Sequence, residues 1–323
     1  MTGAASMPDV PHIPVMAAEV IEALMPRAGG VYVDGTFGAG GYSRALLEAA
    51  DCTVWGIDRD PFAVAAGNEM ATRYPGRLTV LNGRFGDMAS LLDSVDVQHI
   101  DGLALDLGVS SMQIDDPARG FSFREDGPLD MRMGDDGATA ADIVNQLAEQ
   151  ELADVIYRYG EERASRRIAR AIVELREKTT ITRTSQLAEI VRRVVSRSKD
   201  GIDPATRTFQ ALRIYVNDEL GELERGLRAA AALLVPGGRL AVVSFHSLED
   251  RQVKLFLQAG SGNTPRPSRH LPLASSVAAS PVFRLLKRGT IKPRTEEIRL
   301  NPRARSARLR WAERTEAPLG EAA

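Results

Sequence analysis

The sequence of 323 residues predicts an α/β fold in which a doubly wound sheet is interrupted by an inserted all-helical domain. Short apolar runs alternate with helical patterns up to residue 107, helical patterns then follow one another without strands, and strand signals return at residue 239. We therefore expect residues 1–108 and 215–323 to form the α/β domain, and residues 109–214 to form an insertion that serves substrate recognition.

The apolar runs of the first half have the composition of buried parallel strands. Each is short, rich in valine, leucine or isoleucine, and followed by turn residues. The expected strands are residues 30–33, 53–57, 78–81 and 102–107. Helices are expected after the first three strands, at residues 42–50, 62–73 and 87–92. Asp60 and Pro61 fit the N-cap and the first turn of the second helix.

The middle of the chain has helical periodicity without strand signals. Residues 109–128 are typical of a loop, and Thr139 and Thr184 are candidate N-caps of helices that follow. The expected helices cover residues 139–159, 161–178, 185–195 and 204–234. Beyond Pro236-Gly237-Gly238 we expect strands at 239–244, 283–286 and 307–311, a helix at 247–258, and a mobile loop at 260–280.

Composition excludes several classes of protein. Cys52 is the only cysteine, so an internal disulfide is excluded and we expect a buried thiol. No uninterrupted apolar stretch reaches about 18 residues, and the N-terminal segment lacks the pattern of a signal peptide, so we expect a cytoplasmic protein that spans no membrane. The histidines are scattered, and we expect no metal site. They are His12, His99, His246 and His270.

A glycine-rich turn follows the first expected strand and reads Asp34-Gly35-Thr36-Phe37-Gly38-Ala39-Gly40-Gly41. Such a turn brings backbone N–H groups and a helix N-terminus close to a ligand. The dinucleotide pattern G-x-G-x-x-G fails here, because Ser43 stands where the third glycine is required. The turn instead resembles the first motif of S-adenosylmethionine-dependent methyltransferases.

The ends of the next strands carry groups that suit the same cofactor. Asp58 can accept hydrogen bonds from ribose hydroxyls, which NAD and S-adenosylmethionine both possess. Phe85 can lie against adenine, and Asp106 can meet the ammonium of the methionine moiety. Ligands of open α/β sheets bind at the carboxyl ends of the strands, so these residues should share one site.

Beyond the turn, the chain resembles the bacterial 16S ribosomal RNA cytosine-N4 methyltransferases, the MraW or small-subunit methyltransferase H family. The resemblance extends from about residue 12 to residue 310 and includes Asp126-Gly127-Pro128-Leu129-Asp130-Met131-Arg132-Met133 and Ser244-Phe245-His246-Ser247-Leu248-Glu249-Asp250-Arg251. The other matching motifs are residues 34–41, 58–60, 106–111, 119–123, 158–162, 206–217 and 301–307. The resemblance implies a class I, Rossmann-like methyltransferase sheet.

The resemblance also implies a substrate and a set of cofactor contacts. The substrate would be the N4 amine of the decoding-centre cytosine numbered 1402 in 16S RNA, within the small ribosomal subunit, and the enzyme is a possible homodimer. The family commonly has histidine at the position of Tyr42, so here we expect a backbone contact. The implied S-adenosylmethionine contacts are Gly40, Gly41, Tyr42, Asp58, Phe85, Asp106 and Gln113.

The chemistry of a cytosine amine indicates what the acceptor end must supply. The nitrogen lone pair is delocalised into the ring, so the enzyme must align the amine and accept hydrogen bonds from its N–H groups. Asp106, Ser110, Ser111 and backbone carbonyls of the same loop are candidate acceptors. His246 is a candidate for taking the released proton, and Phe245 for stacking on an extruded base.

Basic residues cluster near the C-terminus despite a net charge of −2. Ten arginines and lysines lie between residues 284 and 310, against two acids, and Arg303, Arg305 and Arg308 are the candidate RNA contacts there, together with Phe245. A second basic set lies on the expected insertion helices. It consists of Arg163, Arg166, Arg167, Arg170, Arg192, Arg193 and Arg197.

Two other functions remain open from the residues alone. An NAD-dependent oxidoreductase would use the same fold, although Ser43 speaks against it. A non-catalytic RNA-binding or assembly factor could keep the fold without the reaction, although the complete set of strand-end groups speaks against that. The catalytic base, the oligomeric state and the choice between free RNA and an assembled particle are also open.

Overall fold

The computed structural model describes residues 14–196, 201–262, 280–287 and 289–319. Their centre is a seven-stranded sheet with the order β3-β2-β1-β4-β5-β7-β6, in which β7 is antiparallel to both neighbours and the first five strands are parallel. All seven predicted strands are present. They are β1 Val31–Asp34, β2 Thr53–Asp58, β3 Leu78–Asn82, β4 Ile100–Asp106, β5 Leu234–Ser244, β6 Phe283–Arg284 and β7 Arg308–Arg314.

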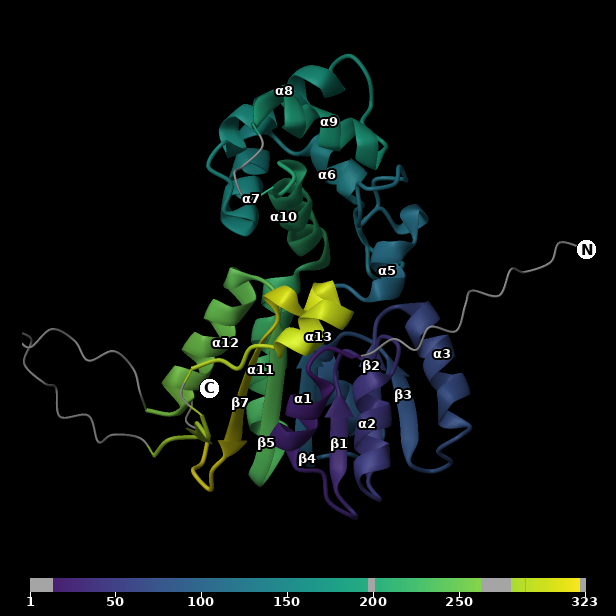
Figure 1. Cartoon of the computed structure of the whole chain (residues 1–323), viewed down its shortest axis with the longest axis vertical. Coiled ribbons are helices and arrows are strands. Elements are labelled where there is room, and N and C mark those ends of the chain that lie inside the picture. The colour runs from purple at the N-terminus through teal and green to yellow at the C-terminus, as the bar shows by residue number, and fades with distance from the viewer. Residues whose placement is uncertain (1–13, 197–200, 263–279, 288, 320–323) are drawn as a thin grey trace, which may run out of the picture.

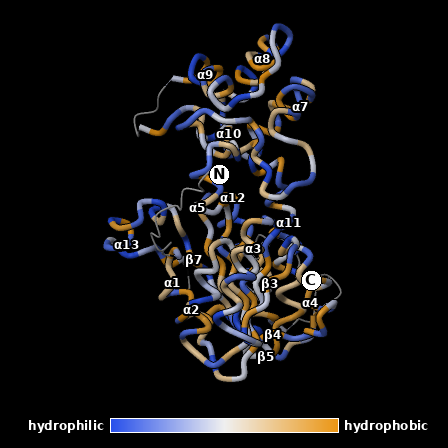
Figure 2. Tube along the Cα trace, turned by 90° about the vertical axis from the view of Figure 1, so that its right-hand side faces the viewer, coloured by the Kyte–Doolittle hydropathy of each residue, from blue (hydrophilic) through white to orange (hydrophobic). Residues whose placement is uncertain are grey.

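Helices cover both faces of the sheet. One face packs against α1 Ala17–Leu24, α2 Gly41–Ala49 and α3 Pro61–Ala71, and the other against α4 Met88–Asp93, α11 Glu219–Leu233 and α12 Ser247–Gly260. Neighbouring strand residues point to opposite cores: Tyr32 lies in the first and Val33 in the second. Figure 2 shows hydrophobic residues concentrated along these strands.

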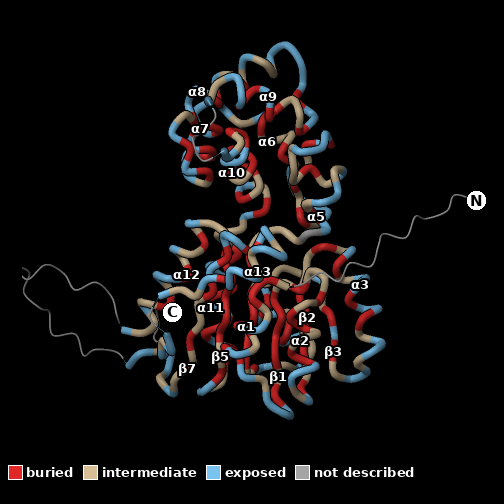
Figure 3. The backbone as a smooth tube through the Cα atoms, in the orientation of Figure 1, coloured by how far each residue is buried: buried red, intermediate tan, exposed pale blue. Residues whose placement is uncertain are grey.

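A helical domain, which we define as α6 to α10, lies beyond the edge of the sheet at which β4 ends (Figure 1). It consists of α6 Ala140–Gln146, α7 Glu149–Gly160, α8 Ser165–Arg176, α9 Thr184–Val194 and α10 Ala205–Asn217. Val144, Ile156, Ile168, Leu187 and Leu212 are fully buried in a core of its own, and Figure 3 shows buried residues lining the inside of this layer. The helical domain therefore packs independently of the two cores of the sheet.

One asparagine joins the helical domain to the sheet. Asn217, buried at the end of α10, donates to the carbonyl oxygen of Met131 and accepts from the amide of Met133. Its amide oxygen also accepts from Arg59, whose guanidinium binds Glu222 of α11 at 3.0 Å. This junction ties the loop after β2 to both ends of the insertion.

Two long predicted helices are broken in the structure. The helix expected over residues 139–159 divides between Gln146 and Glu149, and Arg176 donates to carbonyls of Val144 and Leu147 at the break. The helix expected over 204–234 divides at Asp218, which has φ 50° and starts α11 in a new direction. Apolar periodicity continues through both breaks and so hid them.

Further predictions concern two helix caps and two loops. Thr139 caps α6 as predicted, but Thr184 is the first residue of α9, and its hydroxyl accepts from the amide of Gly127 instead of capping the helix. The loop predicted at 109–128 contains the short helices α5 Ser111–Asp115 and η2 Pro117–Arg119. Most of the predicted loop 260–280 lies outside the described residues.

Several elements were missed by sequence patterns. These are α1, α13 Thr295–Leu300, the short helices η1 Phe85–Asp87 and η3 Pro302–Ser306, and the first five residues of β5. Cys52 is buried, as predicted. Among the described residues, no helix has both the length and the apolar character needed to cross a membrane.

Candidate cofactor and acceptor site

The glycine-rich turn between β1 and α2 packs against the buried ring of Phe37 on its core side. A Cβ atom added to Gly40, Gly56 or Gly67 would lie 2.6, 2.5 or 2.8 Å from the Phe37 ring, so all three glycines are needed for its packing. Gly40 has φ 72° and forms the N-cap of α2. The ring thus holds the turn in place from the core side, and the Pro14 ring packs against Gly41 at its end.

Asp34, at the end of β1, ties the strand to α2. The carboxylate accepts hydrogen bonds from the amide and the hydroxyl of Ser43, at 3.0 and 2.8 Å. Burial raises its pKa to about 6. Ser43, the residue that breaks the dinucleotide pattern, is therefore a structural partner of Asp34, and a glycine there could not replace its hydroxyl.

Asp58, at the end of β2, faces the same turn. Its carboxylate accepts from the amide of Gly38 at 2.7 Å and from the amide of Asp60 at 2.8 Å. Burial raises the pKa of Asp58. The two amides orient the carboxylate at the carboxyl edge of the sheet, where the ribose of a nucleotide-like ligand would meet it.

Asp106, at the end of β4, carries an unpaired buried oxygen. Its backbone amide donates to the hydroxyl of Thr36 at 2.6 Å, but among the described residues its Oδ1 has no hydrogen-bond partner. Burial, with the nearby carboxylates of Asp34 and Glu249, raises its pKa well above the usual range. Buried polar atoms are nearly always paired, so this oxygen fits an incoming cation such as an ammonium group.

The remaining predicted cofactor residues are placed differently. Tyr42 is buried, and its hydroxyl donates to the carbonyl oxygen of Val15 at 2.6 Å, so its side chain is used inside the protein and a backbone contact is what it can offer. Phe85 packs one edge of its ring against α11, where a Cβ on Gly226 would lie 2.5 Å away. That edge belongs to the core, and the ring is only partly buried.

Gln113 belongs to a network that sequence patterns did not predict. It donates to Asp60 at 2.9 Å, and the same carboxylate oxygen accepts from Arg119 at 2.8 Å. Arg119 also donates to the backbone carbonyls of Arg132 and Met133. The network links the loop after β2 to the long loop after β4, two segments that only the folded chain brings together.

Ser110 acts as a helix cap at the acceptor end. Its hydroxyl accepts from the amide of Gln113 at 3.2 Å, while Gln113 accepts from the amide of Ser110 at 3.1 Å. This is a capping box that fixes the start of α5. The side chain of Ser111 lies outside the described part of the structure.

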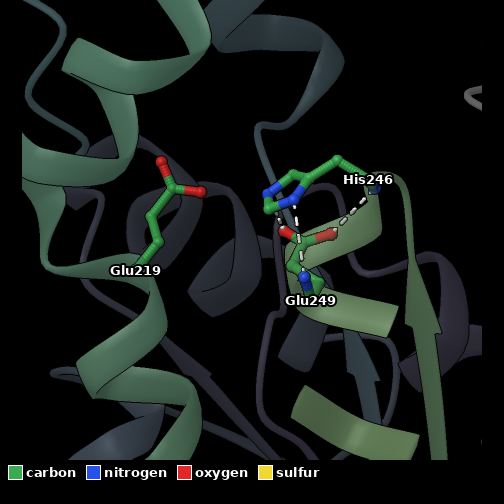
Figure 4. Close-up of side chains that lie close together, drawn as sticks. All are labelled: Glu219, His246 and Glu249. Atoms are coloured by element: carbon green, nitrogen blue, oxygen red, sulfur yellow. Dashed lines mark hydrogen bonds and ion pairs between the residues drawn. The ribbon is translucent and has the colours of Figure 1, made fainter. Parts of the chain in front are cut away.

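His246 and Glu249 form a second capping box at the start of α12 (Figure 4). The Nδ1 atom of His246 accepts from the amide of Glu249 at 3.4 Å, and Nε2 lies 3.0 Å from Oε1 of Glu249. The other oxygen of Glu249 accepts from the amide of Phe245 at 2.8 Å. Burial acts to raise the pKa of Glu249, but its contacts with His246 and Arg213 together lower it.

Glu219 of α11 approaches this pair, so the fold gathers a cluster that the spacing of the residues did not predict. One possible ligand atom from each of Glu219, His246 and Glu249 lies within 4.8 Å of the others (Figure 4). Both oxygens of Glu219, however, bind the guanidinium of Arg213 at 2.8 Å. A fixed positive charge beside the cluster disfavours a metal ion and favours a network of ion pairs.

The basic C-terminal segment divides into paired and unpaired residues. Arg310 binds Asp250 at 2.8 Å, Arg294 binds Glu19 at 3.0 Å, and Arg284 pairs with Glu313, so these three are engaged within the protein. Arg303 pairs with Asp115 of α5. In contrast, Arg305 and Arg308 line a cavity together with Phe245.

The basic residues predicted on the insertion are also partly engaged. Arg170 lies 3.7 Å from Glu149, Arg192 binds Asp203 at 2.9 Å and Arg193 binds Glu189 at 3.3 Å. Arg167 donates to the carbonyl oxygen of Val194. Arg197 lies outside the described residues.

Comparison with known proteins finds relatives over nearly the whole chain. Residues 9–315 match the model of the MraW methylase family. The chain is similar to the proteins named Ribosomal RNA small subunit methyltransferase H from Paramagnetospirillum magneticum (65% identity over 311 residues, 96% of this chain and 98% of that one) and Rhodospirillum centenum (66% over 324 residues, 99% and 98%). The sheet is the class I, Rossmann-like sheet predicted for such enzymes. The chain belongs to the MraW methylase family.

Proposed function

We propose that this protein transfers a methyl group from S-adenosylmethionine to the N4 amine of a decoding-centre cytosine in 16S ribosomal RNA. Its relatives bear the name of small-subunit ribosomal RNA methyltransferases. The single observation that carries the proposal is the unpaired, buried oxygen of Asp106 at the end of β4, on the same edge as Asp58 and the glycine-rich turn.

The cofactor residues would act as follows. Asp58 would receive the ribose hydroxyls, Asp106 the ammonium, and the start of α2 the carboxylate side of the cofactor near Gly40 and Gly41. When bound, the cofactor supplies a methyl group activated by a positively charged sulfur. Phe85 would offer the exposed part of its ring to adenine while its other edge stays against Gly226.

The acceptor base would lie against Phe245, beside the loop after β4. A Cβ added to Gly108 would lie 3.8 Å from Cδ2 of Phe245, so ring and loop are neighbours. An extruded cytosine can stack on such a ring, while Asp106, Ser110, Ser111 or loop carbonyls accept its N–H groups. The role of the protein in this step would be to align the amine and to exclude water.

His246 is better suited to positioning than to proton transfer. A general base must take the released proton on a ring nitrogen, but Nδ1 accepts from a helix amide, and Nε2, which has no hydrogen-bond partner among the described residues, is buried 3.0 Å from Oε1 of Glu249. Both contacts hold the residue that follows Phe245, whose amide is itself bound by Glu249. We therefore assign His246 the task of fixing Phe245 at the end of β5.

The helical domain would recognise the RNA around the target, and the substrate would be the small ribosomal subunit or its RNA in the cytoplasm. Homodimer formation stays a prediction, which sedimentation of the purified protein can test. The domain stands over the carboxyl edge of the sheet, where the substrate must enter (Figure 1). Arg163, which precedes α8, and Arg166, within α8, form no ion pair with a described residue.

The test is methyl transfer from isotope-labelled S-adenosylmethionine to small-subunit particles that lack the modification, followed by mass mapping of the RNA. We expect one labelled methyl on the N4 of one decoding-centre cytosine. Label on another nucleotide would refute the stated substrate. Binding of the particles without any transfer would favour the alternative of a non-catalytic assembly factor.

A further inference from the structure

A cavity of about 580 Å³ lies beside the end of β5, outside the cofactor site. One wall is a face of α12 that presents Ser247, Arg251 and Lys254, at the spacing of successive helical turns. The opposite wall is the segment from Arg305 to Arg308, and Lys292 closes a further side. We call this the basic cavity.

The charges around the basic cavity are not neutralised within the described chain. Lys254, Lys292, Arg305 and Arg308 are exposed, and no described residue forms an ion pair or a side-chain hydrogen bond with any of them. The acid in the wall, Asp250, is already bound by Arg310 at 2.8 and 3.1 Å.

Arg251 forms an ion pair but is still exposed at the basic cavity. It reaches Glu161 of the helical domain at 3.3 Å and remains largely exposed. The four unpaired cations therefore form an excess positive potential in a concave site, which attracts an anion.

The position of the basic cavity relates it to the reacting base. In the sheet, Asp106 pairs with Val243, and the next residue of β5, Ser244, pairs with Arg308. The Phe245 ring lies between these two points, near Gly108 on one side and in the wall of the cavity on the other. The order along the sheet edge is thus carboxylate, aromatic ring, cations.

We propose that the basic cavity binds the phosphodiester backbone of the substrate RNA next to the target nucleotide. This inference rests on the proposed function and adds to it the place where the strand is held. A nucleotide extruded onto Phe245 has its flanking phosphates a short distance from its base, and cations from three separate segments surround the place where they would lie. Holding the backbone there would offset part of the cost of unstacking the base.

The experiment combines variants of the cavity with single neutral linkages in the RNA. RNA fragments containing the target cytosine are made with one methylphosphonate at each position in turn, and their affinity for the full-length protein is measured over a range of salt concentrations. The variants are Lys254→Gln and Arg308→Gln. The matched control is Arg73→Gln, which removes an exposed arginine without a described ion pair after α3, the helix that packs beside β3 at the other edge of the sheet.

We expect Lys254→Gln and Arg308→Gln each to weaken RNA binding about 5-fold and to reduce the slope of log affinity against log salt by about 0.7. A methylphosphonate beside the target should weaken binding to the wild type but not weaken it further in these variants. S-adenosylmethionine affinity should be unchanged, and Arg73→Gln should behave as wild type.

The inference would be overturned if the losses of RNA affinity from a cavity variant and from a methylphosphonate add at every position of the linkage. It would also be overturned if both cavity variants leave the salt slope unchanged. The binding readout keeps it separate from the proposed function. Wild-type protein that binds RNA through the cavity but transfers no methyl group would refute the proposed reaction alone. Normal methyl transfer by both variants with unaltered RNA affinity would refute the basic cavity alone.

Discussion

The proposed cofactor end and the proposed RNA end of this edge of the sheet are built in opposite ways. At the proposed cofactor end, the carboxylates of the buried Asp34 and the half-buried Asp58 accept from backbone amides, and an aromatic ring packs against the core side of the turn. At the RNA end, Lys254 and Arg308 are exposed and unpaired among the described residues. A small ligand would thus meet side chains already held in place, whereas a polymeric anion would meet exposed charges, and variants at the two ends should fail in different ways.

The largest effect should follow from Phe37→Ala at the cofactor end. The ring is buried between three glycines, and its removal leaves a cavity that the backbone cannot fill. We expect a loss of about 3–5 kcal/mol in the free energy of unfolding. Urea denaturation followed by circular dichroism measures it, with Phe62→Ala, an exposed ring, as the control. A loss no larger than that of the control would show that the turn does not depend on this ring.

Asp34→Asn tests the buried carboxylate through pH. The pKa of Asp34 is raised from 3.8 to about 6, so the native state keeps a proton that the unfolded state has already released. The stability of the wild type relative to Asp34→Asn should therefore decrease by about 3 kcal/mol as the pH rises from about 4 to about 6, and then stay constant.

Unfolding curves at closely spaced pH values measure this difference. Asp93→Asn, which removes an exposed carboxylate, is the matched control and should show no such decrease. A difference between wild type and Asp34→Asn that does not vary with pH would contradict the burial argument.

Asp106→Asn should separate binding from stability. Loss of a charged hydrogen bond to the ammonium should weaken S-adenosylmethionine binding about 10- to 100-fold. The free protein should be as stable as the wild type or more so, because the substitution removes a carboxylate whose charged form is disfavoured by burial. Calorimetric titration and thermal unfolding give the two values. Unchanged cofactor affinity would remove Asp106 from the cofactor site.

The smallest effect is expected from His246, where the two ends meet. His246→Ala should lower turnover about 10-fold with little change in cofactor affinity, since it loses the cap that positions Phe245. His246→Asn keeps a capping side chain and should recover most of the activity. If asparagine and alanine are equally impaired, and the pH dependence of turnover disappears in both, His246 acts as the base and not as a positioning residue.

The cofactor end was predictable from sequence because it follows from local order. Short apolar runs rich in valine, leucine or isoleucine predicted the strands, and the parallel sheet then brought Asp58 and Asp106 to one edge. The hydroxyl of Tyr42 is bound to Val15, and the backbone contact with the cofactor expected of Tyr42 stays a prediction.

The acceptor end was less predictable because it depends on contacts between distant segments. The cluster of Glu219 with His246, the link from Asp60 to Arg119, and the pairing of Arg310 with Asp250 all join residues that no periodicity relates. The break at Asp218 was hidden for a related reason, since the apolar pattern runs on through a residue whose φ of 50° redirects the chain.

Asn217 sets a condition for exchanging parts between members of this family. A helical domain excised as residues 109–214 would be cut within the last turn of α10, before the asparagine that binds Met131 and Met133. In such a chimera, the transplanted helical domain would be joined to the sheet through Asn217 and Arg59 of the host protein. A transplanted domain should therefore include residue 217 and its partner at 59 from the donor. Otherwise the donor's helical domain will be held by the junction residues of another protein.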